Sequence, residues 1–313
     1  MTKAINVFSM FDGMSCGQLA LKKAGIKVNT YHASEIDKYA MSITKKNFPS
    51  TLQMGDITKL EDWRLKLIKD EIGIDLVIGG SPCQGFSFAG NQLNFEDPRS
   101  KLFFDFVRVL KILKPKYFLL ENVRMKKESQ DIISEYMGVE PVAINSNLVS
   151  AQNRHRLYWT NIPFDMPEDK ETMLADILED GVTDREKSHC LDANYFKGGN
   201  LKSYFQKHRR QLVFTNRCIQ VGEADLKGFD IIKRVYSPEG KAPTLTTMGG
   251  GHREPKVIVD ELTWRKLSCL ECERLQTVPD GYTEGVSNTQ RYKMLGNGMT
   301  VDVIAHILKG MIV

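Results

Sequence analysis

One cysteine of the chain stands where its thiol could act as a nucleophile. Cys83 follows the strand-like segment Asp75–Ile78 and lies within Gly79–Gly85, which is rich in glycine and contains a proline. A strand that ends in such a loop presents a thiol at the carboxyl edge of a sheet, where backbone dipoles can stabilise a thiolate. Because most cysteines are simply small buried hydrophobes, the residues around Cys83 must decide its role.

An acid and two arginines adjoin other apolar segments. Glu121 comes directly after Tyr117–Leu120, and Arg154 and Arg156 precede Leu157–Thr160. Residues at alternate positions of an extended segment point the same way, and guanidinium groups suit an electron-rich carbonyl or a phosphate. For Glu121 the alternative is a helix cap or a solvated acid.

These residues fit one reaction on a pyrimidine base. C5 of cytosine is a poor nucleophile, but addition of the Cys83 thiolate to C6 gives an enamine whose C5 can accept a methyl group from a sulfonium. Glu121 would bond to N3 and Arg156 to the O2 carbonyl, and loss of the C5 proton would then release the thiol. The set predicts covalent methylation of cytosine in a nucleic acid.

A second group of residues predicts a cofactor that carries a nucleoside. Phe11–Gly17 joins the first predicted strand to the first helix, where free N–H groups and small residues let a ligand approach. Such a turn is more often a simple chain reversal, and this one lacks the GxGxxG fingerprint. Glu35, about 20 residues on, could accept hydrogen bonds from ribose hydroxyls, and Asp56 could meet an adenine amino group.

The elements that position these residues are predicted from the alternation of β-branched and amphipathic segments up to about residue 162, which indicates βαβ units and a mostly parallel sheet. The predicted strands are Ile5–Phe8, Val28–Ala33, Asp75–Ile78, Tyr117–Leu120, Val142–Ile144 and Leu157–Thr160. The predicted helices are Gln18–Ala24, Asp37–Asn47, Trp63–Glu71 and Phe103–Leu113.

After Ile162 the alternation ends, and helical patterns resume only at Trp264–Gln276 and Thr300–Met311. We therefore expect residues 1–163 to form a catalytic, cofactor-binding domain and residues 164–289 a smaller second domain. Residues 290–313 would form a helix that returns to the first domain.

Composition points to a globular protein, with 42% hydrophobic and 26% charged residues among 313. The net charge of +4 indicates no particular partner. However, seven basic residues between Lys187 and Arg217 stand against one acid, a pattern that suits phosphate contact or a solvated loop about equally. Six cysteines and the lack of a signal peptide or membrane-spanning segment predict a cytoplasmic protein without disulfides.

The ordered motifs resemble those of the DNA (cytosine-5)-methyltransferases over almost the whole chain. They are Phe11-Asp12-Gly13, Pro82-Cys83-Gln84, Glu121-Asn122-Val123, Gln152-x-Arg154-x-Arg156, then Arg265–Ser268 with Glu271, Arg274–Gln276 and Pro279, and finally Gly296–Met299. The resemblance implies an α/β fold with a Rossmann-like S-adenosyl-L-methionine-dependent sheet and a smaller target-recognition domain. It also implies transfer of a methyl group from that cofactor to C5 of a flipped cytosine in duplex DNA, without a metal.

The resemblance further implies roles for matching positions. Catalysis would rest on Cys83, Glu121, Arg156 and Arg154. The cofactor would be bound by Phe11 stacked on its adenine, Glu35 on its ribose, Asp56 on its amino group, and by Asp12, Gly13, Met14, Ile36, Ile57, Pro82, Asn297 and Met299. The Thr244-Leu245 pair resembles the family's target-recognition pair. Gln84, Ser87 and, in the basic segment, Arg209 and Arg210 are further expected DNA contacts. A monomer is expected, in a restriction-modification, orphan or phage setting with a cognate endonuclease as a candidate partner.

Two stretches depart from the family pattern. The family commonly has glycine where Met14–Cys16 stands, and Asn-Ser-Val or Asn-Ala-Val where this chain has Asn297–Met299.

Cys269 and Cys272 form a C-x-x-C, but without a second pair they indicate helix packing rather than zinc.

Three other functions were open from the sequence. Methylation of cytosine in transfer RNA is disfavoured because that subgroup's Cys-Phe-Thr signature is absent. A binding subunit without chemistry is disfavoured by the presence of Cys83, Glu121 and Arg156. A dinucleotide oxidoreductase is disfavoured by the missing GxGxxG.

Overall fold

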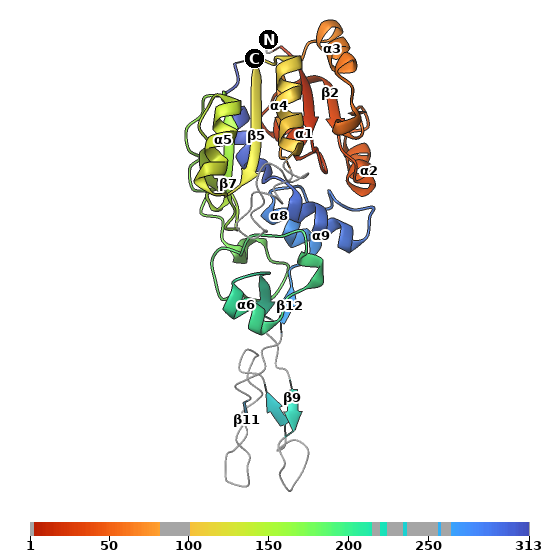
Figure 1. The fold of residues 1–313 in the computed structure, drawn as a ribbon. Helices are drawn as coiled ribbons and strands as arrows, with labels where there is room; N and C mark the ends of the chain where they lie inside the picture. The colour runs from red at the N-terminus through yellow and green to blue at the C-terminus, as the bar shows by residue number, and fades with distance from the viewer. Residues whose placement is uncertain are drawn as a thin grey trace, which may run out of the picture.

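The computed structural model describes residues 3–81, 101–214, 220–223, 234–236, 256–257 and 264–312. Its largest element is a seven-stranded sheet with the order β3-β2-β1-β4-β5-β7-β6 (Figure 1). Neighbouring strands from β3 to β5 are parallel, whereas β7 is antiparallel to both β5 and β6. The strands are β1 (Ile5–Met10), β2 (Val28–Ser34), β3 (Leu52–Gln53), β4 (Leu76–Gly79), β5 (Tyr117–Val123), β6 (Val142–Asn145) and β7 (His155–Thr160).

Helices cover both faces of the sheet, so its central strands are apolar on both sides. In β1, Ile5 and Val7 belong to one hydrophobic cluster, and Phe8 and Met10 to the other. The first cluster is completed by α1 (Cys16–Lys23), α2 (Lys38–Asn47), α8 (Cys269–Leu275), α9 (Asn288–Asn297) and α10 (Val301–Leu308). The second is completed by α3 (Asp62–Glu71), α4 (Lys101–Leu113) and α5 (Lys127–Met137).

Smaller elements lie beyond one end of the sheet (Figure 1). β8 (Leu212–Phe214) and β12 (Trp264–Lys266) pair antiparallel, with Phe214 opposite Trp264. Further from the large sheet, β9 (Gln220–Glu223), β10 (Arg234–Tyr236) and β11 (Lys256–Val257) form a three-stranded sheet. The remaining short elements are η1 (Ile57–Lys59), η2 (Ser146–Leu148), η3 (Leu174–Ile177), η4 (Tyr195–Lys197) and α6 (Leu201–Lys207).

The α/β architecture and the predicted elements of the large sheet are confirmed. All six predicted strands and the four helices between them are present, with ends within three residues of those expected. The helix expected at Thr300–Met311 is α10. The helix expected over Trp264–Gln276 is wrong in its first part, because Trp264–Lys266 is a strand paired with β8 and the helix begins at Cys269.

Three helices, α5, α6 and α9, were not predicted. The sequence does carry a signal for α5, namely apolar Ile133 and Met137 four residues apart, followed by Gly138. In the structure both side chains are buried, and Gly138 ends the helix at a φ of 70°. The division at residues 163 and 289 stays a prediction, and the buried side chains of α8 share the hydrophobic cluster of β1 and α1. Within the described ranges, no helix is long and apolar enough to cross a membrane.

Candidate active site and cofactor cavity

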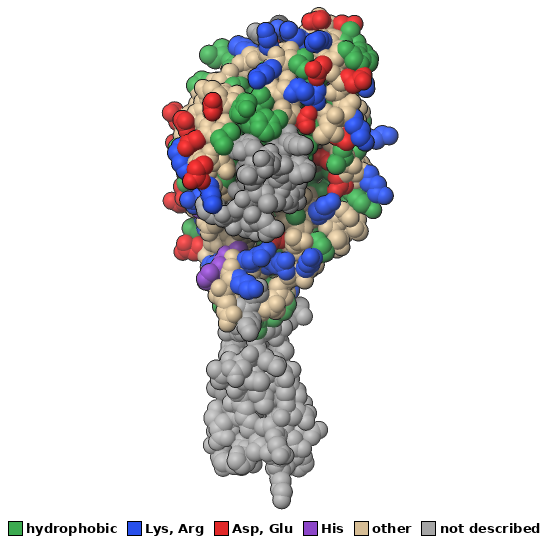
Figure 2. Space-filling model, viewed as in Figure 1, with side chains coloured by type: hydrophobic (Ala, Val, Ile, Leu, Met, Phe, Trp, Pro, Cys, Tyr) green, Lys and Arg blue, Asp and Glu red, His purple; other side chains and the backbone are tan. Residues whose placement is uncertain are grey.

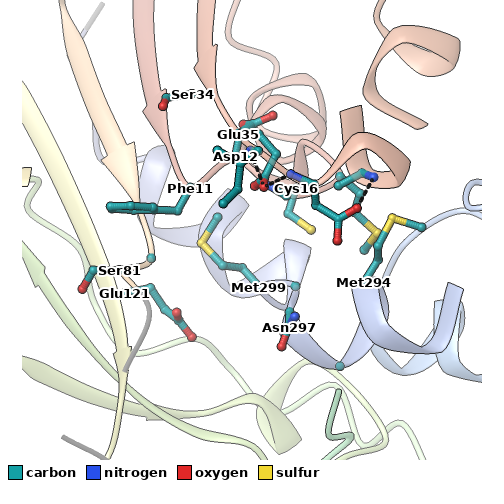
Figure 3. Close-up of a pocket in the computed structure, with 18 of the residues that line it drawn as sticks. Phe11, Asp12, Cys16, Ser34, Glu35, Ser81, Glu121, Met294, Asn297 and Met299 are labelled. Carbon is teal, nitrogen blue, oxygen red and sulfur yellow. Dashed lines mark hydrogen bonds between the residues drawn. The ribbon is translucent and has the colours of Figure 1, made fainter. Parts of the chain in front are cut away.

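A cavity of about 440 Å³ opens at the carboxyl ends of β1, β2, β4 and β5, and the end of α9 forms its opposite wall (Figure 3). This volume lies within the range of about 300–1,000 Å³ of ligand sites, and open α/β sheets bind ligands at this edge. The predicted site residues that line it are Phe11, Asp12, Gly13, Met14, Glu35, Ile36, Asp56, Ile57, Glu121, Arg154, Arg156, Asn297 and Met299. The fold thus brings these described residues, which come from distant parts of the sequence, into one cavity.

The loop after β1 is held in a strained conformation by a buried carboxylate. Phe11 and Ser15 have φ values of 55° and 64°, in the left-handed region that costs a residue other than glycine about 1–3 kcal/mol. The carboxylate of Asp12 accepts hydrogen bonds from the hydroxyls of Ser15, Ser9 at 2.6 Å and Tyr31 at 2.8 Å. Burial raises the pKa of Asp12, against the effect of these hydroxyls. The Asp12 side chain therefore supports the loop that presents Phe11 to the cavity.

Glu35 joins the loops that follow β1 and β2. Its Oε1 accepts hydrogen bonds from the backbone N–H groups of Ile36 and Asp37, both at 2.8 Å, and its Oε2 accepts one from Gly13 at 2.7 Å. A carboxylate offers about four acceptor positions. One acceptor position of Oε2 is therefore left for a hydroxyl group in the cavity.

Asp56 has a similar free position. Its Oδ1 accepts hydrogen bonds from the backbone N–H and the hydroxyl of Thr58 at 3.0 and 2.8 Å. The hydroxyl bond is the main reason why the pKa of Asp56 lies below its ordinary value. The Nζ of Lys59 forms an ion pair with Oδ2 at 3.7 Å, a distance that leaves Oδ2 able to accept an N–H from a ligand as well. Ile36, which is 75% exposed, adds apolar surface to the same cavity.

Glu121 and Arg156 form an ion pair at the end of β5. The Nε of Arg156 is 3.0 Å from Oε1 of Glu121, and their side chains are 14% and 11% exposed. Gly80 lies against the other oxygen, since a Cβ there would stand 3.0 Å from Oε2. Figure 3 shows Glu121 facing Asn297 and Met299 across the cavity.

Arg154 has different partners from Arg156, although both line the cavity. The residue is 2% exposed, and its guanidinium donates to the carbonyl oxygens of Leu191 at 3.0 Å, Gly298 at 2.8 Å and Gly296 at 3.2 Å. This arrangement occupies Arg154 with the protein backbone, which favours a supporting role over contact with a substrate.

The two stretches that depart from the family pattern lie against each other. A Cβ on Gly298 would stand 3.1 Å from Cε of Met14 and 3.3 Å from Sγ of Cys16. The absence of a side chain at Gly298 thus makes room for the larger side chains of the first loop. Burial raises the pKa of the Cys16 thiol to about 12, so this cysteine is held neutral beside the cavity.

Some predicted residues lie outside the described part of the chain, namely Pro82, Cys83, Gln84, Ser87, Thr244 and Leu245. Residue 81 is described, and Ser81 lines the cavity. Its hydroxyl accepts a hydrogen bond of 3.1 Å from Nδ2 of Asn122. Sequence reasoning gave no role to Asn122, although it stands inside the Glu-Asn-Val motif.

Of the predicted DNA contacts, Arg209 and Arg210 are described. Arg209 is exposed and pairs with Oδ2 of Asp192 at 3.0 Å, while Arg210 donates to the carbonyl of Gly198 at 2.9 Å. Figure 2 shows Lys and Arg side chains gathered with His on this part of the molecule. Lys187 does not belong to such a surface, because its Nζ binds the carbonyls of Asn147, Ser150 and Thr172.

A family model described as C-5 cytosine-specific DNA methylase matches residues 5–312. The chain belongs to this family. The methylase is 30% identical to the orphan methyltransferase M.SPBetaI of Bacillus phage SPbeta, over 98% of this chain and 97% of that protein. It is 29% identical to the type II methyltransferase M.HhaI of Haemophilus parahaemolyticus, over 97% of this chain and 93% of that protein.

The alignment with the phage enzyme extends over 438 positions, so that enzyme carries insertions relative to the 313 residues of this methylase. A solved structure, the Entamoeba histolytica methyltransferase EhMeth, has the same fold with a TM-score of 0.68 at 17% identity, over 98% of both chains. The predicted enzyme class and fold are thereby confirmed. The protein is a DNA (cytosine-5)-methyltransferase with S-adenosyl-L-methionine as cofactor.

The cavity fits this cofactor. Phe11, Ile36 and Ile57 offer apolar surface for an adenine. The free acceptor positions of Glu35 and Asp56 suit ribose hydroxyls and an exocyclic amino group. When bound, the cofactor supplies an electrophilic methyl group.

Proposed function

We propose that the methylase modifies C5 of a cytosine rotated out of duplex DNA, through a covalent bond between Cys83 and C6. The Glu121–Arg156 pair is the observation that carries this proposal. A carboxyl group that donates its proton and a guanidinium, held side by side, match N3 and O2, which are adjacent acceptors on the cytosine ring. Ser81, two residues before Cys83 in the sequence, lines the same cavity.

Each residue has a defined task in this reaction. The Cys83 thiolate adds to C6 while protonated Glu121 gives its proton to N3, so the ring becomes a neutral enamine with electron density at C5. Arg156 holds O2 and the carboxylate of Glu121 together. After C5 has taken the methyl group, a solvent base removes the C5 proton, N3 returns its proton to Glu121 and the C6–S bond breaks, which restores the aromatic ring, the acid and the thiolate.

We further propose that Phe11, Glu35, Asp56, Asn297 and Met299 bind the cofactor, and that Arg209 and Arg210, with Gln84, Ser87, Thr244 and Leu245, contact the DNA. The relatives named above are phage orphan and type II enzymes. They support an orphan, phage or restriction-modification setting. Our proposal is a monomeric, cytoplasmic enzyme, with a cognate endonuclease if the setting is restriction-modification.

A covalent trap tests the nucleophile. Bisulfite sequencing of DNA from a host that expresses the methylase first identifies the target site. A duplex with 5-fluorocytosine at that site is then incubated with enzyme and S-adenosyl-L-methionine, and the denatured mixture is separated by gel electrophoresis. We expect a stable adduct with the wild type and with Cys190→Ser, which alters a cysteine that is exposed, but none with Cys83→Ser.

Two results would contradict the proposal. An adduct that persists in Cys83→Ser would assign the bond to another residue. Methylation of transfer RNA without methylation of the duplex would exclude DNA as the substrate.

A further inference from the structure

Arg154 is a buried cation whose partners among the described residues are neutral. Its Nη1 donates to the carbonyl of Leu191 at 3.0 Å, and its Nη2 to the carbonyls of Gly298 at 2.8 Å and Gly296 at 3.2 Å. Sγ of Cys190 is a further contact at 3.5 Å. One guanidinium thus ties two segments that are about a hundred residues apart in the sequence.

The first segment is the cavity wall at the end of α9. The last carbonyls of a helix lack helical partners and carry partial negative charge. Arg154 satisfies those of Gly296 and Gly298, and Nε2 of Gln276 binds Leu295 at 2.6 Å and Gly298 at 3.2 Å. These bonds set the path of the backbone on both sides of Asn297, which lines the cavity.

The second segment leads toward the proposed DNA contacts. Gly296 packs directly on the backbone of Asp192 and Ala193, where an added Cβ would stand 2.3 Å from Asp192. The side chain of Asp192 pairs with Arg209 at 3.0 Å and lies 3.8 Å from Arg210. Residues 191–193 therefore lie between the cavity wall and two exposed or partly exposed arginines.

We propose that Arg154 is a positioning residue that couples cofactor binding to DNA binding. It fastens the Gly296–Met299 wall to residues 191–193. When Arg209 turns from Asp192 to a DNA phosphate, the resulting shift of residues 191–193 is passed to the wall. The inference rests on the proposed function, because it takes the cavity as the cofactor site and Arg209 as a DNA contact. Lysine is a poor replacement for Arg154, because its single compact ammonium lacks the planar fork whose Nη1 reaches Leu191 while Nη2 reaches Gly296 and Gly298.

The coupling is measured as the Kd of S-adenosyl-L-homocysteine without the target duplex, divided by its Kd with the duplex. Isothermal titration gives both values. No turnover occurs, because this compound carries no methyl group to transfer. We expect the duplex to tighten binding several-fold in the wild type. In Arg154→Lys we expect binding without DNA to weaken about tenfold and the ratio to fall toward one.

Arg274→Lys is the matched control. Arg274 also binds a loop carbonyl, that of Ile177 at 2.9 Å, and an acid, Asp280, but it does not line the cavity. Both affinities should remain at wild-type values in this variant. Because Arg154 is buried and the Arg274 side chain is 30% exposed, urea unfolding of both variants is measured alongside, and the affinities are compared where both variants are folded. The proposed coupling predicts a lower ratio only in Arg154→Lys.

A second variant keeps the test decisive if Arg154→Lys does not fold. Asp192→Asn removes the charge that pairs with Arg209 but keeps an oxygen for the N–H of Asn194, which Oδ1 accepts at 2.9 Å. We expect a reduced ratio with cofactor affinity unchanged in the absence of DNA. A ratio of one in the wild type, or wild-type ratios in both Arg154→Lys and Asp192→Asn, would overturn the inference. If Phe11→Ala leaves cofactor affinity unchanged, the proposed cofactor site fails instead.

Discussion

Glu121 and Arg156 occupy diagonal positions on neighbouring antiparallel strands. Glu121 on β5 is opposite Tyr158 on β7, and Arg156 is opposite Val123. Diagonal residues on one face of such a pair are within reach of long side chains, and here Nε and Oε1 are 3.0 Å apart. The reversal of β7 in an otherwise parallel part of the sheet thus delivers the arginine to the acid.

Replacement of Glu121 by glutamine should abolish most of the activity. A glutamine can still bond to Arg156 through its carbonyl, but it cannot give a proton to N3 of the base. General acid catalysis contributes about 100-fold or more, so we expect kcat to fall at least that far. Single-turnover assays with a tritiated methyl donor measure this rate.

The same variant should bind the duplex and the cofactor nearly as well as the wild type, because its shape is preserved. If kcat remains within threefold of the wild type, Glu121 is not the proton donor. A fall in kcat that is matched by loss of duplex binding would instead assign Glu121 to substrate binding.

Replacement of Glu35 by glutamine should weaken cofactor binding about tenfold, because an amide has one acceptor oxygen where the carboxylate uses two. Isothermal titration with S-adenosyl-L-homocysteine measures the change. Glu128→Gln, on the exposed side of α5, is the control and should leave the Kd unchanged. Equal Kd values in Glu35→Gln and the wild type would remove Glu35 from the site.

His189 should make stability depend on acidity. Burial, with the charges of Arg185 and His208, lowers the pKa of His189 to about 4 from 6.5. The folded protein therefore favours the neutral ring, so its stability is complete above pH 6.5 and declines as pH falls toward 4. Allowing for partial exposure, we expect a loss of about 1–2 kcal/mol over this range.

His189→Asn should lose this part of the pH dependence. Urea unfolding at several pH values between 7 and 4.5 gives the comparison. An equally steep decline in the variant and the wild type would show that other groups are responsible.

Alanine at Gly296 should destabilise the fold. Its Cβ would stand 2.3 Å from the backbone of Asp192, and overpacking of this kind costs about 1–3 kcal/mol. Urea unfolding at neutral pH measures the change. Asn297→Ala, at the next and exposed position, should alter the unfolding free energy by less than about 0.5 kcal/mol. Equal unfolding free energies of Gly296→Ala and Asn297→Ala would mean that the backbone of residues 192–193 can move away from Gly296 at little cost.

The sequence predicted the strands of the large sheet from their apolar runs, and it singled out Glu121 and Arg156 by their chemistry. Their contact depends on the antiparallel direction of β7, which places the start of that strand beside the end of β5. The sequence did not predict the partners of Arg154. Alternation within the motif correctly turned both arginines to one cavity, but the carbonyls of Leu191 and Gly298 come from segments whose approach depends on tertiary packing. The strand at Trp264–Lys266 was missed for the same reason, since its extended form depends on pairing with β8.

The pairing of Phe214 with Trp264 has a consequence for how such a methylase can vary. The chain leaves through β8 and returns through β12, so the two ends of residues 215–263 are anchored side by side. Because the ends of this segment are fixed, its length can change without altering the geometry of the cavity or the large sheet. The β8–β12 pair is therefore a junction at which the chain can be lengthened or exchanged while the catalytic residues stay in place.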